Sequence, residues 1–339
     1  MAIRALIVGM GSRGRDWARE IVAAPAYELA GCVDPSRQAL AAASDNFGIP
    51  QDRCLTDAEG AMDKTPCDLV VVACPVEDHQ AACVSALSRE IAVLVEKPFA
   101  MNLADARSVA ALAGRVRRPL IVAQNYRYMR AFRTVRRVLQ GDALGPVGLA
   151  HLHYYRVPHE MASSLARSPH AALMGVAIHH LDLLRYLLPP PVTGVLADTF
   201  TIAPTGQPGG ASLEVLLVFG NGARASYSAT YESSGHEYFE GGQEFYARFV
   251  GEGATLHVFH RWLVLCERSR LPRVVFRGRR QATEERVLLD QMERALATGE
   301  PPESSGRDNL QTMAVVDACL RSAAERRWID PRELLDEPA

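Results

Sequence analysis

Short apolar runs alternate with longer segments of helix-forming residues over the first 124 positions of the chain. The apolar runs cover residues 3–8, 27–33, 68–73, 91–95 and 120–123. The last three contain almost no polar residue, which is typical of strands that are buried on both faces of a parallel sheet. With helical segments at 16–24 and 36–47, these runs predict a doubly wound α/β domain over residues 1–124.

The pattern changes after Asn125, where strand-like runs are joined by turn signals. After an alternation that begins at Val147, these runs are 192–202, 212–219, 223–231, 244–250 and 255–259. The turn Gly220-Asn221-Gly222 joins two of them and favours a hairpin, so we expect an antiparallel sheet. Helical segments at 130–139, 171–188, 284–297 and 308–326 complete a second α/β domain, residues 125–339, whose last helices can pack back on the first domain.

Charge and cysteine content argue against several classes of protein. The 339 residues include 37 basic and 39 acidic ones, and the net charge of −2 argues against nucleic acid or a membrane surface as a partner. No apolar window reaches the roughly 18 residues of a membrane span and no signal peptide opens the chain, so the cytoplasm is the expected location. The seven cysteines form no C-x-x-C pair, so we expect neither a metal site nor a disulfide framework.

Lysine is almost absent from the chain. Lys64 and Lys97 are the only two lysines, so 35 of the 37 basic residues are arginine. Because this chain uses arginine where a generic cation suffices, a remaining lysine is a candidate for a position that needs a compact ammonium group of tunable pKa.

A glycine-rich turn follows the first strand. In Gly9-Met10-Gly11-Ser12-Arg13-Gly14, the first glycine permits a tight turn, the second lets the backbone approach a pyrophosphate, and the third allows close helix packing. The helix N-terminus that follows attracts the anion. Asp34 stands twenty positions after Gly14 at the end of a second strand, where a carboxylate binds ribose hydroxyls and favours NAD. Arg13 and Arg37 flank this place and can pair with a 2′-phosphate, which leaves NADP open.

The triplet Glu96-Lys97-Pro98 stands at the end of a buried strand, where open α/β sheets bind their ligands. Together with the glycine turn, it makes the chain resemble the glucose-fructose oxidoreductase, inositol dehydrogenase and rhizopine catabolism (Gfo/Idh/MocA) family. Further features that carry the resemblance, in family order, are Ala73-Cys74-Pro75 with His79, Asn125-Tyr126-Arg127, Gly145-Pro146-Val147-Gly148 and His179-His180-Leu181-Asp182. They span almost the whole chain.

The resemblance implies a nucleotide-binding Rossmann domain, followed by an α/β domain with a large open sheet whose outer face often builds homodimers or homotetramers. It also implies hydride transfer between a nicotinamide and a hydroxyl-bearing carbon of a sugar, cyclitol or related polyol. On that basis Lys97 would orient and polarise the hydroxyl oxygen, and His179 would be the general acid/base.

The expected binding residues fall into two groups. Those expected at the cofactor are Gly9, Gly11, Ser12, Arg13, Gly14, Asp34, Arg37, Cys74, Pro75, His79, Glu96, Lys97 and Asn125. Those expected at the substrate are Lys97, Arg127, Tyr155, His179 and His180.

The chain departs from the family at one position. Most members carry an Asp four residues before the helix histidine, one turn away on the same face, and here that residue is Gly175. Either Lys97 and His179 suffice for the chemistry, or another group replaces the carboxylate, or redox activity is lost. The candidate replacements are His180, Tyr155, His159, Glu160 and His170, whereas Asp182 is interpreted as mainly structural.

Three hypotheses about function follow. The favoured one is an NAD(P)-dependent dehydrogenase or reductase that acts on CH–OH groups. The alternative is a dinucleotide-binding regulatory or scaffold protein that has lost turnover, and Gly175 is its best support. A third possibility keeps catalysis but uses transient oxidation to enable elimination or glycoside cleavage, with the cofactor regenerated.

Overall fold

A computed structural model provides the structure of the chain. It describes residues 2–157, 170–188, 191–202, 210–233, 243–259, 262–277 and 282–336. The chain divides into two compact units: residues 1–125 with 282–313, and residues 126–281 with 314–338. The first unit therefore consists of two stretches of chain that are more than 150 residues apart.

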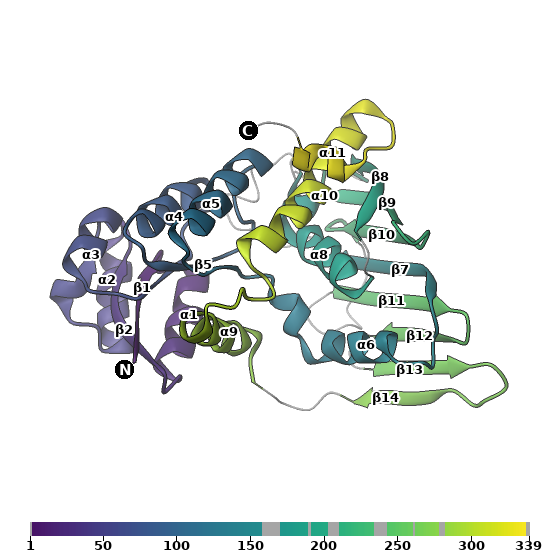
Figure 1. The fold of residues 1–339 in the computed structure, drawn as a ribbon, viewed down its shortest axis with the longest axis horizontal. Helices are drawn as coiled ribbons and strands as arrows, with labels where there is room; N and C mark the ends of the chain where they lie inside the picture. The colour runs from purple at the N-terminus through teal and green to yellow at the C-terminus, as the bar shows by residue number, and fades with distance from the viewer. Residues whose placement is uncertain are drawn as a thin grey trace. The chain divides into compact units, whose positions relative to one another are not determined.

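The first unit is built on a six-stranded parallel sheet with the strand order β3-β2-β1-β4-β5-β6 (Figure 1). Its strands are β1 (Ile3–Val8), β2 (Tyr27–Val33), β3 (Cys54–Leu55), β4 (Leu69–Val72), β5 (Ala92–Val95) and β6 (Leu120–Val122). Every residue of β4, β5 and β6 is buried, which confirms the interpretation of the apolar runs. The strand order reverses between β1 and β4, and ligands of such sheets bind at the carboxyl ends of the strands beside this reversal.

Helices and short turns connect these strands. They are α1 (Ser12–Val22), α2 (Arg37–Phe47), η1 (Gln51–Arg53), α3 (Ala58–Lys64), η2 (Val76–Asp78), α4 (His79–Ser88), α5 (Leu103–Val116) and, from the later stretch, α9 (Glu284–Thr298). Side chains cap the N-termini of several of these helices. Ser36 accepts a hydrogen bond from the Ala39 amide at the start of α2, and Asn102 accepts one from the Asp105 amide at the start of α5.

The second unit is built on an eight-stranded sheet with the order β14-β13-β12-β11-β7-β10-β9-β8. Its strands are β7 (Val147–Arg156), β8 (Val192–Phe200), β9 (Ser212–Phe219), β10 (Arg224–Thr230), β11 (Gln243–Gly251), β12 (Ala254–Phe259), β13 (Trp262–Glu267) and β14 (Arg273–Arg277). All neighbours are antiparallel except β7 and β10, which run parallel. The expected fold class, a Rossmann sheet followed by a large, mostly antiparallel sheet, is confirmed.

Helices of the second unit cover one face of its sheet. The helical elements are η3 (Asn125–Tyr128), α6 (Arg130–Gln140), the π-helical turn η4 (Leu173–Ala177), α8 (Ile178–Leu187), α10 (Gly306–Glu325) and α11 (Pro331–Asp336); η3 and α10 begin with residues of the first unit. Along β7, Leu152 and Tyr154 are buried towards α8, whereas His153 and Tyr155 point to the opposite, outer face. In the part of the chain that the structure describes, no helix is both long and apolar enough to cross a membrane.

Candidate functional site

The backbone of the glycine turn has a shape that requires glycine. Gly9 has a φ of 98°, and a Cβ at this position would lie 2.5 Å from the Cys74 amide nitrogen. A Cβ at Gly14 would lie 1.8 Å from the carbonyl oxygen of Gly9. Side chains at these two positions would therefore collide with fixed backbone, so the tight turn and the close packing of α1 both depend on them.

Gly11 differs from the other two glycines, because the space in front of it is open. A Cβ built on Gly11 meets no described atom within 4 Å. Gly11 is also the N-cap of α1, and no described side chain accepts a hydrogen bond from that helix start. The amide groups at the start of α1 thus have no side-chain acceptor among the described residues, and such a helix start is the arrangement that binds the pyrophosphate of a dinucleotide. The residues of this turn fit such a group.

Asp34 connects this turn with the end of β2. One carboxylate oxygen accepts a hydrogen bond from the Met10 amide at 2.8 Å, and the other accepts one from the Ser36 amide at 2.8 Å. The side chain is half-buried, so its carboxylate is fixed by backbone groups yet reachable for a ribose. Arg37, the first residue of α2, is exposed.

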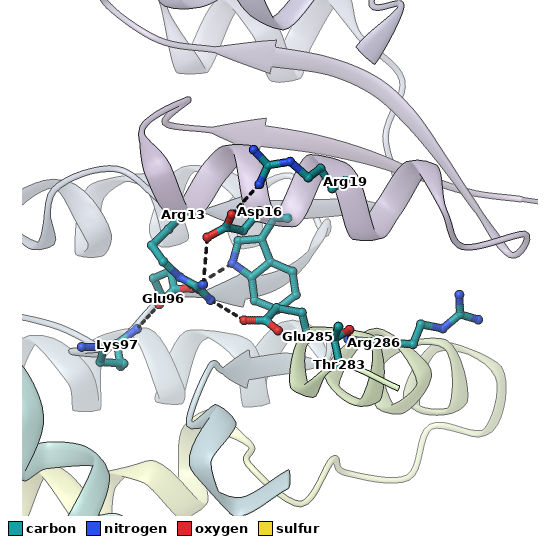
Figure 2. A network of polar contacts seen from close by, with 9 residues as sticks. Arg13, Asp16, Arg19, Glu96, Lys97, Thr283, Glu285 and Arg286 are labelled. Carbon is teal, nitrogen blue, oxygen red and sulfur yellow. Dashed lines mark hydrogen bonds and ion pairs between the residues drawn. The ribbon is translucent and has the colours of Figure 1, made fainter. Parts of the chain in front are cut away.

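Arg13 lies at the centre of a polar network that joins α1, α9 and the end of β5 (Figure 2). Its guanidinium donates to Glu96 at 2.8 Å, to Glu285 at 2.9 Å and to Asp16 at 3.2 Å. Burial acts to lower the pKa of Arg13, but Glu96 and Glu285 outweigh it and raise the pKa. The cation that was expected beside a cofactor phosphate is here paired with three carboxylates of the protein.

Glu96 carries the network to Lys97. One oxygen of this buried carboxylate accepts hydrogen bonds from Arg13 and, at 2.9 Å, from the indole nitrogen of Trp17. The other accepts one from the Lys97 backbone amide at 3.3 Å. Burial lowers the pKa of the Lys97 ammonium, and Arg13 adds to this effect while Glu96 opposes it. The surroundings of Lys97 therefore lower the pKa of its ammonium group. A lysine of tunable pKa is what the scarcity of lysine in the chain suggests for this position.

His79 connects the two loops that follow β4 and β5. Its Nδ1 lies 2.8 Å from the carbonyl oxygen of Pro98, and its Nε2 lies 3.0 Å from that of Cys74. The ring is 2 % exposed, and burial lowers its pKa. His79 is thus a positioning residue: it fixes the loop that carries Lys97 to the loop on which the glycine turn packs. Pro75 is the residue directly before η2.

Several polar side chains at the carboxyl end of β6 are buried without a hydrogen-bond partner among the described residues. They are both amide atoms of Gln124, Oδ1 of Asn125, Oγ of Ser304 and both amide atoms of Asn309. Buried polar atoms are rarely left unpaired, so a bound molecule or ordered water is expected there. Asn125 was predicted to contact the cofactor, and its unpaired acceptor fits that role.

In the second unit, His179 and His180 occupy different environments on α8. His179 is 6 % exposed and stacks on Tyr126, with ring centroids 4.2 Å apart and an 8° angle between the planes. His180 is fully enclosed; its Nδ1 lies 2.9 Å from the Tyr227 hydroxyl, and burial lowers its pKa to about 3. His180 therefore stays neutral at physiological pH, as a core residue rather than a proton carrier.

Arg127 and Asp182 form a buried ion pair. Two nitrogens of the guanidinium donate to the two carboxylate oxygens at 2.6 and 2.5 Å, and both side chains are at most 2 % exposed. Asp182 is structural, as expected. Arg127 was predicted to bind substrate, but in this structure its bidentate face is directed at Asp182.

The remaining candidates are spread apart. Tyr155 stacks on His153 with centroids 4.7 Å apart on the outer face of the sheet, so the fold does not bring it together with His179. Gly175 lies in the π-helical turn η4, and His170 is half-buried before it. His159 and Glu160 lie outside the described residues. Among the described residues, no group of three or more His, Cys, Asp and Glu side chains could hold a metal ion.

Sequence reasoning missed Trp17, Glu285, Gln124, Ser304 and Asn309. Trp17 lies four positions after Arg13, so a helical projection already places both on one face of α1. Glu285 and Ser304 carry no such signal, because they come from the late stretch that joins the first unit.

Comparisons with known proteins agree with this geometry. Residues 3–124 match the model of the oxidoreductase family with an NAD-binding Rossmann fold, and residues 132–257 match the GFO/IDH/MocA C-terminal domain. The chain is similar to a D-apiose dehydrogenase of Paraburkholderia graminis, with 28% identity over 91% of this chain and 84% of that protein. It is also similar to inositol 2-dehydrogenase 2 of Saccharopolyspora erythraea, with 25% identity over 98% and 96% of the two chains.

Solved structures share the fold. An oxidoreductase of Agrobacterium radiobacter in complex with NAD+, L-tartaric acid and magnesium superposes with a TM-score of 0.89 at 24% identity, over 98% of this chain and 100% of that one. A levoglucosan dehydrogenase in complex with NADH has a TM-score of 0.85 at 20% identity, over 97% and 99%. With both of its domains matched, this chain belongs to the Gfo/Idh/MocA family of oxidoreductases, whose N-terminal domain is an NAD-binding Rossmann fold.

Proposed function

We propose that this chain is an NAD-dependent dehydrogenase that acts on a hydroxyl-bearing carbon of a sugar, cyclitol or related polyol. The observation that carries the proposal is Lys97. In a chain with two lysines, one of them follows β5 at the carboxyl end of the sheet, with a lowered pKa and with its backbone amide bound to Glu96. The names of the relatives, which include dehydrogenases of apiose and inositol, support the substrate class.

The roles of the residues follow from their contacts. The amides at the start of α1 and the carboxylate of Asp34 would hold the dinucleotide, and Asn125 would offer it an acceptor. A bound nicotinamide would supply the hydride acceptor for the alcohol carbon. Lys97 would donate a hydrogen bond to the substrate oxygen, which lowers the pKa of that hydroxyl, and His179 would take up its proton.

Gly175 means that the helix histidine lacks the usual carboxylate one turn earlier. We propose that turnover proceeds without it, with the orientation of His179 set by the stacked ring of Tyr126. The alternative of a regulatory protein without turnover is not favoured, because the relatives are named as dehydrogenases and reductases.

The test uses the two lysines as a matched pair. Wild type, Lys97→Met and Lys64→Met are screened for reduced-nicotinamide absorbance with NAD and NADP over a panel of aldoses, cyclitols and other polyols. Lys64 is exposed at the end of α3, so Lys64→Met should leave kcat unchanged. Lys97→Met should lower kcat by about 100-fold or more, the usual contribution of a positioned proton donor. Equal rates for wild type and Lys97→Met would refute the assigned role.

We also propose that copies of this chain associate through the outer face of the eight-stranded sheet. Large apolar side chains there are between 44% and 47% exposed: Leu149, Leu216, Phe259, Trp262 and Val274. They lie on five different strands of one face, and such a surface marks an interaction site. Leu216→Arg should lower the mass measured by light scattering, and an unchanged mass would argue against this face.

A further inference from the structure

Two of the seven cysteines face each other inside the first unit. Cys32 on β2 and Cys54 on β3 are paired neighbours in the parallel sheet, and their sulfur atoms are 3.6 Å apart. Both are free thiols. Paired strands lie about 4.8 Å apart, which is within the Cα separation of roughly 4.4–6.8 Å that a disulfide bridges. The two side chains can therefore be joined without taking the strands apart.

The two thiols differ in access. Cys54 is half-buried in the short edge strand β3, whereas Cys32 is fully buried. Burial raises the pKa of the Cys32 thiol, and Cys54 and Asp34 raise it further. A small oxidant therefore reaches Cys54 first, and Cys32 is placed to react with the oxidised sulfur.

This pair is directly linked to the cofactor site. Asp34 follows Cys32 by two residues, and its backbone amide donates a hydrogen bond of 3.2 Å to the carbonyl oxygen of Leu55, the residue after Cys54. The carboxylate of Asp34 in turn binds the Met10 amide of the glycine turn. Both strands therefore connect the cysteine pair to Asp34, the residue that would hold the adenosine ribose: β2 leads into it, and β3 binds its amide through Leu55.

We propose that Cys32 and Cys54 form a reversible disulfide with hydrogen peroxide as oxidant, and that this modification weakens dinucleotide binding. The effect on binding rests on the function proposed above, whereas the disulfide itself does not. The Cys54 sulfur attacks the peroxide oxygen, which gives a sulfenic acid and water. The Cys32 sulfur then displaces the hydroxyl as a second water, so two thiols lose two electrons and two protons and one peroxide is reduced to two waters.

The bond requires a movement at the cofactor site. The sulfur atoms must approach from 3.6 Å to about 2.05 Å. Cys32 is packed in the sheet and Cys54 is on the edge strand, so β3 is the element that shifts. Leu55 moves with it and pulls on the Asp34 amide. Because a binding carboxylate has to be held to within about 0.5 Å, this shift weakens the contact with the ribose.

Trypsin makes the cross-link easy to detect. Cleavage after arginine and lysine places Cys32 in the peptide of residues 20–37 and Cys54 in the peptide of residues 54–64, each with no second cysteine. Cys67, Cys74 and Cys83 all fall in the peptide of residues 65–89. The full-length protein is reduced, treated with hydrogen peroxide, blocked with iodoacetamide and digested without reductant, and the dissociation constant for NAD is measured before and after by calorimetry.

The expected result is a cross-linked species of residues 20–37 and 54–64, two hydrogens lighter than the sum of both peptides, with NAD binding about tenfold weaker and restored by dithiothreitol. Cys54→Ser and Cys32→Ala should lose both effects. The control Cys67→Ser, a half-buried thiol in the same unit, should keep them. Absence of the cross-link, or a cross-link with unchanged NAD affinity, would overturn the proposal. Failure of the reduced protein to bind NAD would instead contradict the proposed function, while the cross-link can still be scored.

Discussion

Replacement of Asp182 with asparagine is predicted to destabilise the second unit strongly. The variant keeps the size of the side chain but removes the negative charge that accepts both hydrogen bonds of the Arg127 guanidinium fork. Arg127 is 2 % exposed, so its guanidinium cannot regain water without local unfolding. Breaking a buried ion pair at one partner costs about 3–5 kcal/mol. At roughly 2–4 °C per kcal/mol for a unit of this size, the melting temperature should fall by about 6–20 °C.

Differential scanning calorimetry and urea unfolding measure this effect, and a double variant separates its causes. Arg127→Met combined with Asp182→Leu removes both charges, so it should be more stable than Asp182→Asn, because no unpaired charge stays buried. Arg127 and Asp182, whose guanidinium nitrogen and carboxylate oxygen are 2.5 Å apart, should also show a coupling energy in the double-mutant cycle. A loss of less than about 1 kcal/mol in Asp182→Asn, the range of an exposed ion pair, would refute the reasoning.

Further predictions concern the glycine turn and the buried histidine. Gly14→Ala should abolish NAD binding and lower the melting temperature, because its Cβ would lie 1.8 Å from the Gly9 carbonyl oxygen. Gly11→Ala should keep wild-type stability and weaken NAD binding by about tenfold. Equal melting temperatures of the two variants in calorimetry would contradict this prediction. His180 has a pKa of about 3 in the folded protein, below its ordinary value of 6.5. Between these values the unfolded chain binds the proton and the folded chain does not, so the unfolding free energy should fall as the pH is lowered from about 6.5 towards 3. Urea unfolding of wild type and His180→Phe over this range checks the sign, since the variant should lack this contribution.

Much of the first unit could be predicted from local patterns. The runs that became β4 and β5 are apolar because both faces of the strands are covered, and that condition leaves a direct trace in the sequence. The glycine turn leaves a similar trace, because Gly9 and Gly14 each avoid a collision with backbone. The hairpin at residues 220–222 was confirmed as well; its trace is a glycine at a left-handed backbone position, since Gly222 has a φ of 87° between paired β9 and β10.

Partner choice among charged side chains could not be predicted. Arg13 meets Glu96 and Glu285, which are 83 and 272 positions away, and neither periodicity nor spacing relates such residues. Strands β13 and β14 were missed. In β14 the arginines at both ends of the strand obscure its apolar run, and Arg273 is exposed beside its ion-pair partner Glu267. The position of Tyr155 on the outer face could not be predicted either. It depends on which alternate residues of β7 point inward, and this is known only once Tyr154 is placed on the inner face.

The discontinuous first unit has a consequence for synthesis of the chain. Strand β6 is an edge until the late stretch arrives: Val122 donates its amide to the Ser304 carbonyl, and Ile121 bridges to Ser305. Two hydrogen bonds likewise form only when this stretch has been made: Arg13 donates to Glu285, and the Tyr27 hydroxyl donates to the Leu289 carbonyl oxygen. On the ribosome, the nucleotide-binding half is therefore left with an unprotected sheet border, and Arg13 without one of its three carboxylate partners, until residues 285–305 have been synthesised.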